Sequence, residues 1–302
     1  MQRAGFCCER KARVRASPVQ SAGKGAIIAW TAFVLVLAAA LLHASWNLLV
    51  KASNDRLVAG WAQVFFGALV FLPFLLTVGI PWSAWPYFLV SGFIHVAYSL
   101  SLVTAYERAD LSVVYPIARG AAPLFITVVA FAFLDDRPGV VGLGAILILT
   151  TGVLITGIPR GGGGSWWALV TAAFIATYTS IDGAAVRWLG ESFAYTITVF
   201  VTGALLFTPI VVWSHGWARL GTAVRREQWR YVFAGIASAG AYGLVLVAAR
   251  SAPLGLVAAV RETSVVFGAL GGWLILKEPL GARRLRAAAL IAAGLVLLAF
   301  AG

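Results

Sequence analysis

Charged residues are scarce in this 302-residue chain. Asp, Glu, Lys and Arg together make up only 11% of the residues, whereas 61% are hydrophobic and the mean hydropathy is +0.91. A soluble domain usually carries about 25% charged residues, so this composition excludes a water-exposed surface over most of the chain. The sequence therefore predicts a protein that lies in a lipid bilayer.

Residues for disulfides, metal binding and nucleophilic chemistry are also few. The chain has three histidines and only two cysteines, Cys7 and Cys8, which are adjacent and do not easily form an unstrained bridge. No HExxH, GxSxG or Walker-type motif occurs, and the run Gly161–Gly164 lacks the Lys-Ser/Thr of a phosphate loop. We therefore predict no enzyme activity, no metal, no cofactor and no ATP-driven transport.

Positive charge exceeds negative charge, with 23 basic and 11 acidic residues. Most of the basic residues lie in the tail of residues 1–25, in loops and at the ends of apolar runs, which is typical of membrane electrostatics. We therefore expect the partners to be the lipid bilayer and a small-molecule substrate, and no nucleic acid. The oligomeric state is not indicated by the sequence.

Ten apolar runs follow the tail. Each is long enough for a membrane-spanning helix of about 20 residues, and none has the alternation of a barrel strand. The sequence thus predicts an all-α polytopic membrane protein with ten transmembrane helices. The runs are residues 26–50, 57–79, 85–106, 111–134, 139–158, 166–186, 192–213, 229–249, 253–276 and 284–301.

A glycine-rich linker, residues 159–165, divides the ten runs into two sets of five, residues 26–158 and 166–301. A shift of 142 positions aligns two pairs of arginines, Arg250 with Arg108 and Arg261 with Arg119. Because five is odd, a duplicated unit enters the membrane in the opposite sense. We therefore expect two inverted five-helix repeats around a central cavity, an architecture typical of transporters.

Four polar segments within the runs resemble the EamA-type transporters of the drug/metabolite transporter superfamily. The resemblance covers residues 26–300, and it includes an acidic residue after the fourth helix of each repeat. It implies two five-helix repeats and the export or exchange of small metabolites through a central cavity. The four segments are residues 42–51, 115–123, 178–183 and 260–267, and the two acidic residues are Asp136 and Glu278.

Two arginines lie near the centres of predicted helices, Arg119 in the fourth and Arg261 in the ninth. An arginine there is unfavourable by about 2.5 to 3.5 kcal/mol on insertion scales, so it indicates a use or a compensating partner. We expect both to face the cavity and to bind a carboxylate, phosphate or phosphonate of the substrate. The alternative is structural pairing with a neighbour such as Glu262 or Asp182.

Other substrate-binding candidates share helix faces with polar neighbours. Tyr115 lies four residues before Arg119, in a helix whose two prolines predict a kink that frees backbone carbonyls. Trp46 and Asn47 lie in the first helix, and Tyr98 lies in the third. For Asn47, a hydrogen bond between helices remains an equal alternative to a substrate contact.

Three residues are candidates for coupling transport to protons or to a counter-substrate: Glu262, Asp182 and His95. Glu262 points about 100° away from Arg261 around the helix, so it needs a second partner. If that partner is Arg119, protonation of Glu262 releases the arginine for substrate; otherwise the two form a permanent pair. Asp182 is expected near the interfacial end of its helix, and His95 is either a proton relay or a core residue.

These features predict a secondary transporter or exporter of a small organic metabolite, anionic or zwitterionic, that works by alternating access. The alternatives are an exporter of amino acids or amphiphilic drugs, and a non-transporting scaffold or lipid-acting protein. We expect a multi-pass protein of the cell inner (plasma) membrane. The resemblance suggests cytoplasmic termini, whereas the basic residues outside the tail favour the reverse orientation.

Overall fold

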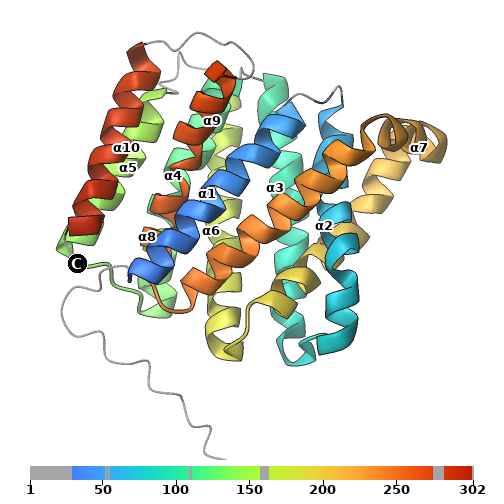
Figure 1. Cartoon of the computed structure of the whole chain (residues 1–302), viewed down its shortest axis with the longest axis horizontal. Helices are drawn as coiled ribbons and strands as arrows, with labels where there is room; N and C mark the ends of the chain where they lie inside the picture. The colour runs from blue at the N-terminus through green and yellow to red at the C-terminus, as the bar shows by residue number, and fades with distance from the viewer. Residues whose placement is uncertain are drawn as a thin grey trace, which may run out of the picture.

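The computed structural model describes residues 29–51, 53, 55–108, 111–156, 163–274 and 282–300. The regular elements in these ranges are all helices, which confirms the predicted all-α class (Figure 1). Six of the described helices, α1, α2, α3, α4, α6 and α7, are long and apolar enough to cross a membrane. The elements are α1 (Trp30–Lys51), α2 (Arg56–Val78), η1 (Trp82–Ala84), α3 (Trp85–Arg108), α4 (Leu111–Leu134), α5 (Val140–Thr156), α6 (Gly163–Leu189), α7 (Phe193–Ala249), α8 (Leu254–Arg261), α9 (Ser264–Leu274) and α10 (Ala282–Phe300).

Helix α7 joins two of the predicted runs without a loop between them. Its 57 residues would measure about 85 Å if straight, far more than the roughly 30 Å hydrocarbon core. The chain turns at Gly216 (φ 70°, ψ 153°) and at Glu227 (φ −123°, ψ 21°). These turns form an elbow, residues 216–227, between two long arms (Figure 1). The predicted runs 192–213 and 229–249 correspond to the two arms, and the segment that connects them is itself helical between the two turns.

The predicted helix over residues 253–276 is broken into α8 and α9. Glu262 and Thr263 form a turn, in which their N–H groups donate to the carbonyls of Ala259 and Val260, three residues earlier. The prediction of one continuous helix was wrong here, although no proline marks the break. By contrast, α4 stays helical through its two prolines.

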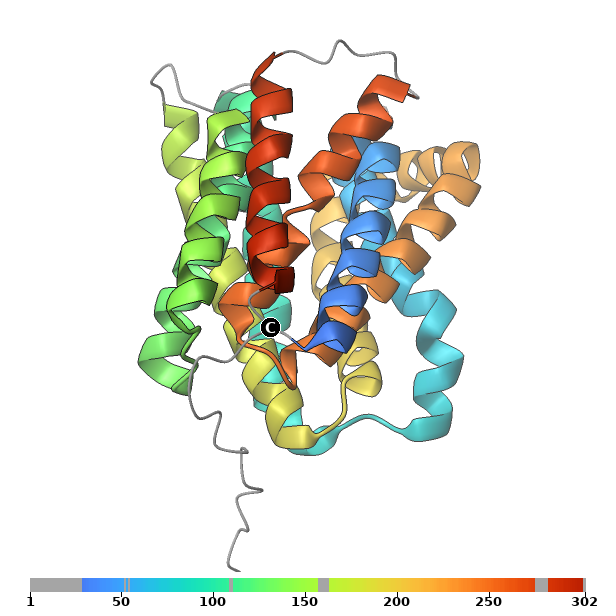
Figure 2. The same cartoon turned by 60° about the vertical axis from the view of Figure 1, so that its left-hand side comes forward.

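The second arm of α7 packs closely against α2, and two glycines allow this approach. A Cβ atom on Gly235 would lie 2.5 Å from the backbone nitrogen of Gly67, so a side chain cannot be placed there. Elsewhere α3 and α4 pack on α6, and α5 packs on α10 (Figure 2). Small residues at crossings are typical of membrane helices, where close backbone contact stabilises the bundle.

Candidate functional site

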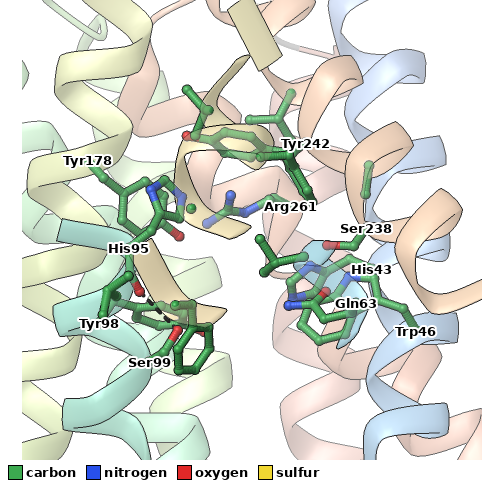
Figure 3. Close-up of a pocket in the computed structure, with 18 of the residues that line it drawn as sticks. His43, Trp46, Gln63, His95, Tyr98, Ser99, Tyr178, Ser238, Tyr242 and Arg261 are labelled. Atoms are coloured by element: carbon green, nitrogen blue, oxygen red, sulfur yellow. Dashed lines mark hydrogen bonds between the residues drawn. The ribbon is translucent and has the colours of Figure 1, made fainter. Parts of the chain in front are cut away.

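A cavity of about 100 Å³ lies inside the bundle, and seven helices contribute to its wall: α1, α2, α3, α4, α6, α7 and α8. The wall is mainly aromatic and apolar, with polar groups on several sides (Figure 3). Its polar and aromatic residues are His43, Trp46, Gln63, His95, Tyr98, Ser99, Arg119, Tyr178, Phe200, Phe207, Ser238, Tyr242 and Arg261. Both predicted central arginines therefore line one cavity.

Arg119 of α4 forms a buried ion pair with Glu262 at the break between α8 and α9. The guanidinium Nε donates to Oε2 at 3.1 Å, and Nη2 lies 2.9 Å from Oε1. Both side chains are almost fully buried, and Glu262 is not part of the cavity wall. The second partner predicted for Glu262 is thus Arg119, and the pair joins the two halves of the chain.

Arg261 ends α8 and has a different environment. Only 4% of the residue is exposed, yet its Nε and Nη2 atoms make no hydrogen bond to any described residue. In the close-up it lies between the side of His95 and Tyr178 and the side of His43 and Gln63 (Figure 3). Its donors are therefore available to a molecule in the cavity.

Two further wall residues carry buried polar atoms without a hydrogen-bond partner among the described residues. Trp46 has an unused indole N–H, and Gln63 has an unused side-chain oxygen. Buried polar groups are hydrogen-bonded in the great majority of cases, so such a group calls for an explanation. Together with Arg261, these residues offer donors and one acceptor to the same small space.

Asp182 of α6 is fully buried and is held by hydroxyl groups. Ser91 donates to it at 2.9 Å and Tyr195 at 2.6 Å, and Tyr242 donates to the same carboxylate. No salt bridge joins it to a described cation. The expected solvation of Asp182 near its helix end is therefore wrong, because side chains from α3 and both arms of α7 cover the carboxylate. Tyr242, which donates to Asp182, also lines the cavity.

His95 of α3 connects this network to the cavity wall. Its Nδ1 atom lies 2.9 Å from the carbonyl oxygen of Ser91 and 3.2 Å from the Ser91 hydroxyl. A carbonyl oxygen only accepts, so Nδ1 carries a proton in this arrangement. The ring also stacks on Tyr178 with a centroid distance of 3.9 Å. His95 is therefore oriented on both sides and lines the cavity.

The other predicted substrate residues divide into three cases. Trp46 and Tyr98 line the cavity. Asn47 does not, because its side-chain amide donates to the carbonyl of His43 in its own helix at 2.7 Å. The side chain of Tyr115 lies outside the described part of the structure.

Several wall residues were not among the predicted site residues. Gln63 and Ser238 are polar residues within apolar runs, so the signal that indicated the arginines applies to them as well. His43 and Tyr242 were harder to identify, since the sequence does not show which face of a helix meets the cavity. Tyr242 has a double role, as a wall residue and as a donor to Asp182.

A second ion pair fixes the start of α8, which carries Arg261 at its other end. Asp136, after α4, accepts from the Leu254 backbone N–H at 2.8 Å and from Arg187 at 3.0 Å. Arg187 also donates to the carbonyls of Ala249 and Ala252. The acidic residue predicted after the fourth helix therefore has a structural role. Its predicted counterpart, Glu278, lies outside the described residues.

Comparison with known proteins shows a family similarity in the second half of the chain. Residues 162–300 match the model of the EamA-like transporter family, and no curated protein matches the chain. A solved structure described as "Crystal structure of protein" has a TM-score of 0.71 at 16% identity, covering 90% of this chain and 99% of its own. That likeness concerns the fold alone. The apolar helices and the match over residues 162–300 support a multi-pass membrane protein that is similar to the EamA-like transporters.

Proposed function

We propose that the chain is a secondary transporter of a small organic metabolite, anionic or zwitterionic, and that the metabolite binds in the central cavity. The observation that carries this proposal is the buried guanidinium of Arg261, which lines the cavity and whose Nε and Nη2 atoms have no hydrogen-bond partner among the described residues. A guanidinium binds carboxylate, phosphate or phosphonate through two parallel hydrogen bonds. Arg261 is therefore the proposed anchor for the negative group of the substrate.

A zwitterion fits the other unused groups of the wall. The indole N–H of Trp46 is a second donor for a carboxylate, and the Gln63 oxygen is an acceptor for an ammonium group. The faces of Tyr178 and Tyr242 can contact an ammonium or an apolar side chain. This lining also favours the second candidate function, export of amino acids or of amphiphilic drugs.

A non-transporting scaffold or a lipid-acting protein fits the cavity less well. In a scaffold, we expect a dry interior in which every arginine has an acidic partner, as Arg119 has in Glu262. Arg261, by contrast, forms no salt bridge with a described acidic residue. The family match also favours transport over an enzyme activity.

Alternating access requires the cavity to widen and to open to each side in turn. The cavity of about 100 Å³ is smaller than most ligand pockets, which measure about 300 to 1,000 Å³. The break between α8 and α9 is a suitable hinge, because interrupted helices at substrate depth are typical of secondary transporters. In this proposal, α1–α5 and α6–α10 form two inverted five-helix repeats that move about the site.

Coupling is proposed to act through Glu262. A substrate anion and the Glu262 carboxylate compete for Arg119, which is a wall residue. Protonation of Glu262 removes this competition, so that a proton and the anion bind together. Asp182 and His95 are the second candidates for the proton-binding group, since their network reaches the cavity through His95 and Tyr242.

The proposed location is the inner (plasma) membrane, with both termini in the cytoplasm. The first residues of α1 and the end of α10 lie toward the end of the bundle opposite the elbow (Figure 2). A reporter fused to the C-terminus tests the orientation. Activity of a periplasm-dependent reporter would show that the termini are outside.

Counterflow in proteoliposomes tests the proposed function. Liposomes loaded with one unlabelled compound are assayed for uptake of its labelled form, using a panel of carboxylates, amino acids, phosphate esters and cationic amphiphiles. We expect exchange of at least one anionic or zwitterionic compound, and none in protein-free liposomes. Exchange of cationic compounds alone would refute the anion preference, and no exchange across the panel would favour the scaffold.

A further inference from the structure

A second pocket, with a volume of about 510 Å³, lies at the elbow of α7. Its wall comes from Asp55 and the first turn of α2, from His215, and from the elbow that follows His215. Its polar lining residues are Asp55, His215, Arg219, Thr222 and Arg226. None of its lining residues also lines the central cavity, so it is a separate site.

Exposed tryptophans indicate the depth of this pocket relative to the membrane. Trp213 is 90% exposed, Trp217 is 70% exposed and Trp229 is 80% exposed, and all three lie in or beside the elbow. Tryptophan is enriched at the membrane–water interface, where its apolar ring and its N–H group are both accommodated. The elbow therefore lies at the level of the lipid headgroups.

The charge of the pocket comes from two arginines on one face of the elbow. Arg219 and Arg226 are seven residues apart, which is about two helical turns, and Thr222 lies between them. Neither arginine has a salt bridge to a described residue. Both guanidiniums are therefore available to an external anion.

The acidic residue of the pocket does not neutralise these arginines. One oxygen of Asp55 accepts from the backbone N–H groups of Leu57 and Val58 at the start of α2. The other oxygen lies 2.9 Å from Nε2 of His215. Asp55 thus caps α2 and contacts His215, the residue before the elbow, so the pocket keeps a positive excess.

We propose that this pocket binds the phosphate headgroup of an anionic phospholipid. Arginine binds phosphate oxygens in a bidentate manner, and basic pockets beside membrane helices attract anionic headgroups. A lipid is favoured over a soluble phosphate because the tryptophans place the pocket at headgroup level. A bound headgroup holds the elbow against α2, and the arm of α7 beyond the elbow carries Ser238 and Tyr242 of the central cavity.

The test uses the full-length protein in neutral detergent, titrated with phosphatidylglycerol or phosphatidylcholine. Bound lipid is counted by native mass spectrometry, and the affinity is taken from the shift in melting temperature. We expect phosphatidylglycerol to bind more tightly than phosphatidylcholine. In the double variant Arg219→Gln/Arg226→Gln, the affinity for phosphatidylglycerol should fall about tenfold, so that the preference is lost. Its control is Arg225→Gln/Arg230→Gln, which removes the same number of charges from two residues in or beside the elbow that do not line the pocket.

Three results would overturn the proposal. They are an equal loss of phosphatidylglycerol affinity in the two double variants, an equal affinity of the wild type for both lipids, and a rise in melting temperature with inorganic phosphate that equals the rise with phosphatidylglycerol. The first would indicate a diffuse surface charge and the third a soluble ligand. If the double arginine variant does not fold, Ala218→Phe replaces it, because this change fills the pocket without altering charge. It must likewise lower phosphatidylglycerol binding about tenfold, as expected if the headgroup contacts are lost.

Discussion

The two sides of the central cavity hold their buried carboxylates in different ways. On the side of α4 and α8, Glu262 is balanced by the charge of Arg119, at 2.9 and 3.1 Å. On the side of α3, α6 and α7, Asp182 accepts hydrogen bonds from three neutral hydroxyl groups. A substrate anion can compete for a guanidinium, but it cannot take hydroxyl donors whose geometry is fixed by α3 and by both arms of α7. This difference favours Glu262 over Asp182 as the group that responds to substrate.

The largest effect on stability is expected for Arg119→Gln. The change leaves the fully buried carboxylate of Glu262 without its cation, and breaking a buried ion pair in this way destabilises a protein by about 3 to 5 kcal/mol. Unfolding in detergent, followed by circular dichroism, measures the loss. The double variant Arg119→Gln/Glu262→Gln should recover most of it. Failure of the second change to restore stability would show that the ion pair is not the cause.

A smaller loss of stability is expected for Asp182→Asn. An amide has one acceptor oxygen instead of two, so a buried hydroxyl donor loses its partner, which is unfavourable by about 1 to 3 kcal/mol. Substrate exchange and its dependence on pH should persist. Tyr195→Phe is the matched control, because it removes one donor and leaves the carboxylate. A folded Asp182→Asn protein without pH dependence would instead identify Asp182 as the coupling group.

Glu262→Gln is expected to change pH dependence while folding and exchange persist. The remaining charge of Arg119 faces the cavity, where water can solvate it, and the new amide oxygen still accepts from Nε. Wild-type net uptake of the anion should rise as the pH falls, because protonation releases Arg119, whereas the variant should show a flat profile. Uptake in proteoliposomes at a series of pH values measures both.

Two other results for Glu262→Gln would each contradict the coupling role. Net uptake that still rises as the pH falls would place coupling elsewhere, with Asp182 and His95 as the next candidates. Loss of folding and expression would favour a permanent pair that fixes the contact between α4 and α8.

The smallest effect is expected for Asn47→Ala. Its amide donates to a carbonyl of its own helix and does not line the cavity, so counterflow should stay within about twofold of wild type. Trp46→Phe, one residue earlier, removes an unused N–H donor from the wall and should weaken binding more. An equal loss of counterflow activity in Asn47→Ala and Trp46→Phe would show that Asn47 contacts substrate in another conformation.

Hydropathy was sufficient to predict the class of fold and part of the site. Long apolar runs predicted membrane helices, and the unfavourable placement of an arginine in lipid predicted Arg119 and Arg261 as cavity residues. The same argument would have added Gln63. Trp46, Tyr98 and His95 were also predicted and line the cavity.

Features that depend on contacts between distant segments could not be predicted. The break at Glu262 and Thr263 contains no proline or glycine, so nothing in the local sequence marks it. The burial of Asp182 depends on Tyr195 and Tyr242, which come from other parts of the chain. The basic residues of the elbow interrupt the apolar pattern, so the pattern does not predict a helix there.

The anion-binding role of Arg261 is tested most directly by counterflow of an exchanged anion with wild type, Arg261→Gln and the exposed control Arg225→Gln. Losing a charged partner in a buried site weakens binding by about 2 to 5 kcal/mol, so Arg261→Gln should lower the apparent affinity by about 30-fold or more. Its melting temperature should not fall, because the guanidinium has two atoms without a hydrogen bond to any described residue. The control should match wild type. Exchange of the same anion by folded Arg261→Gln with unchanged affinity would contradict the account.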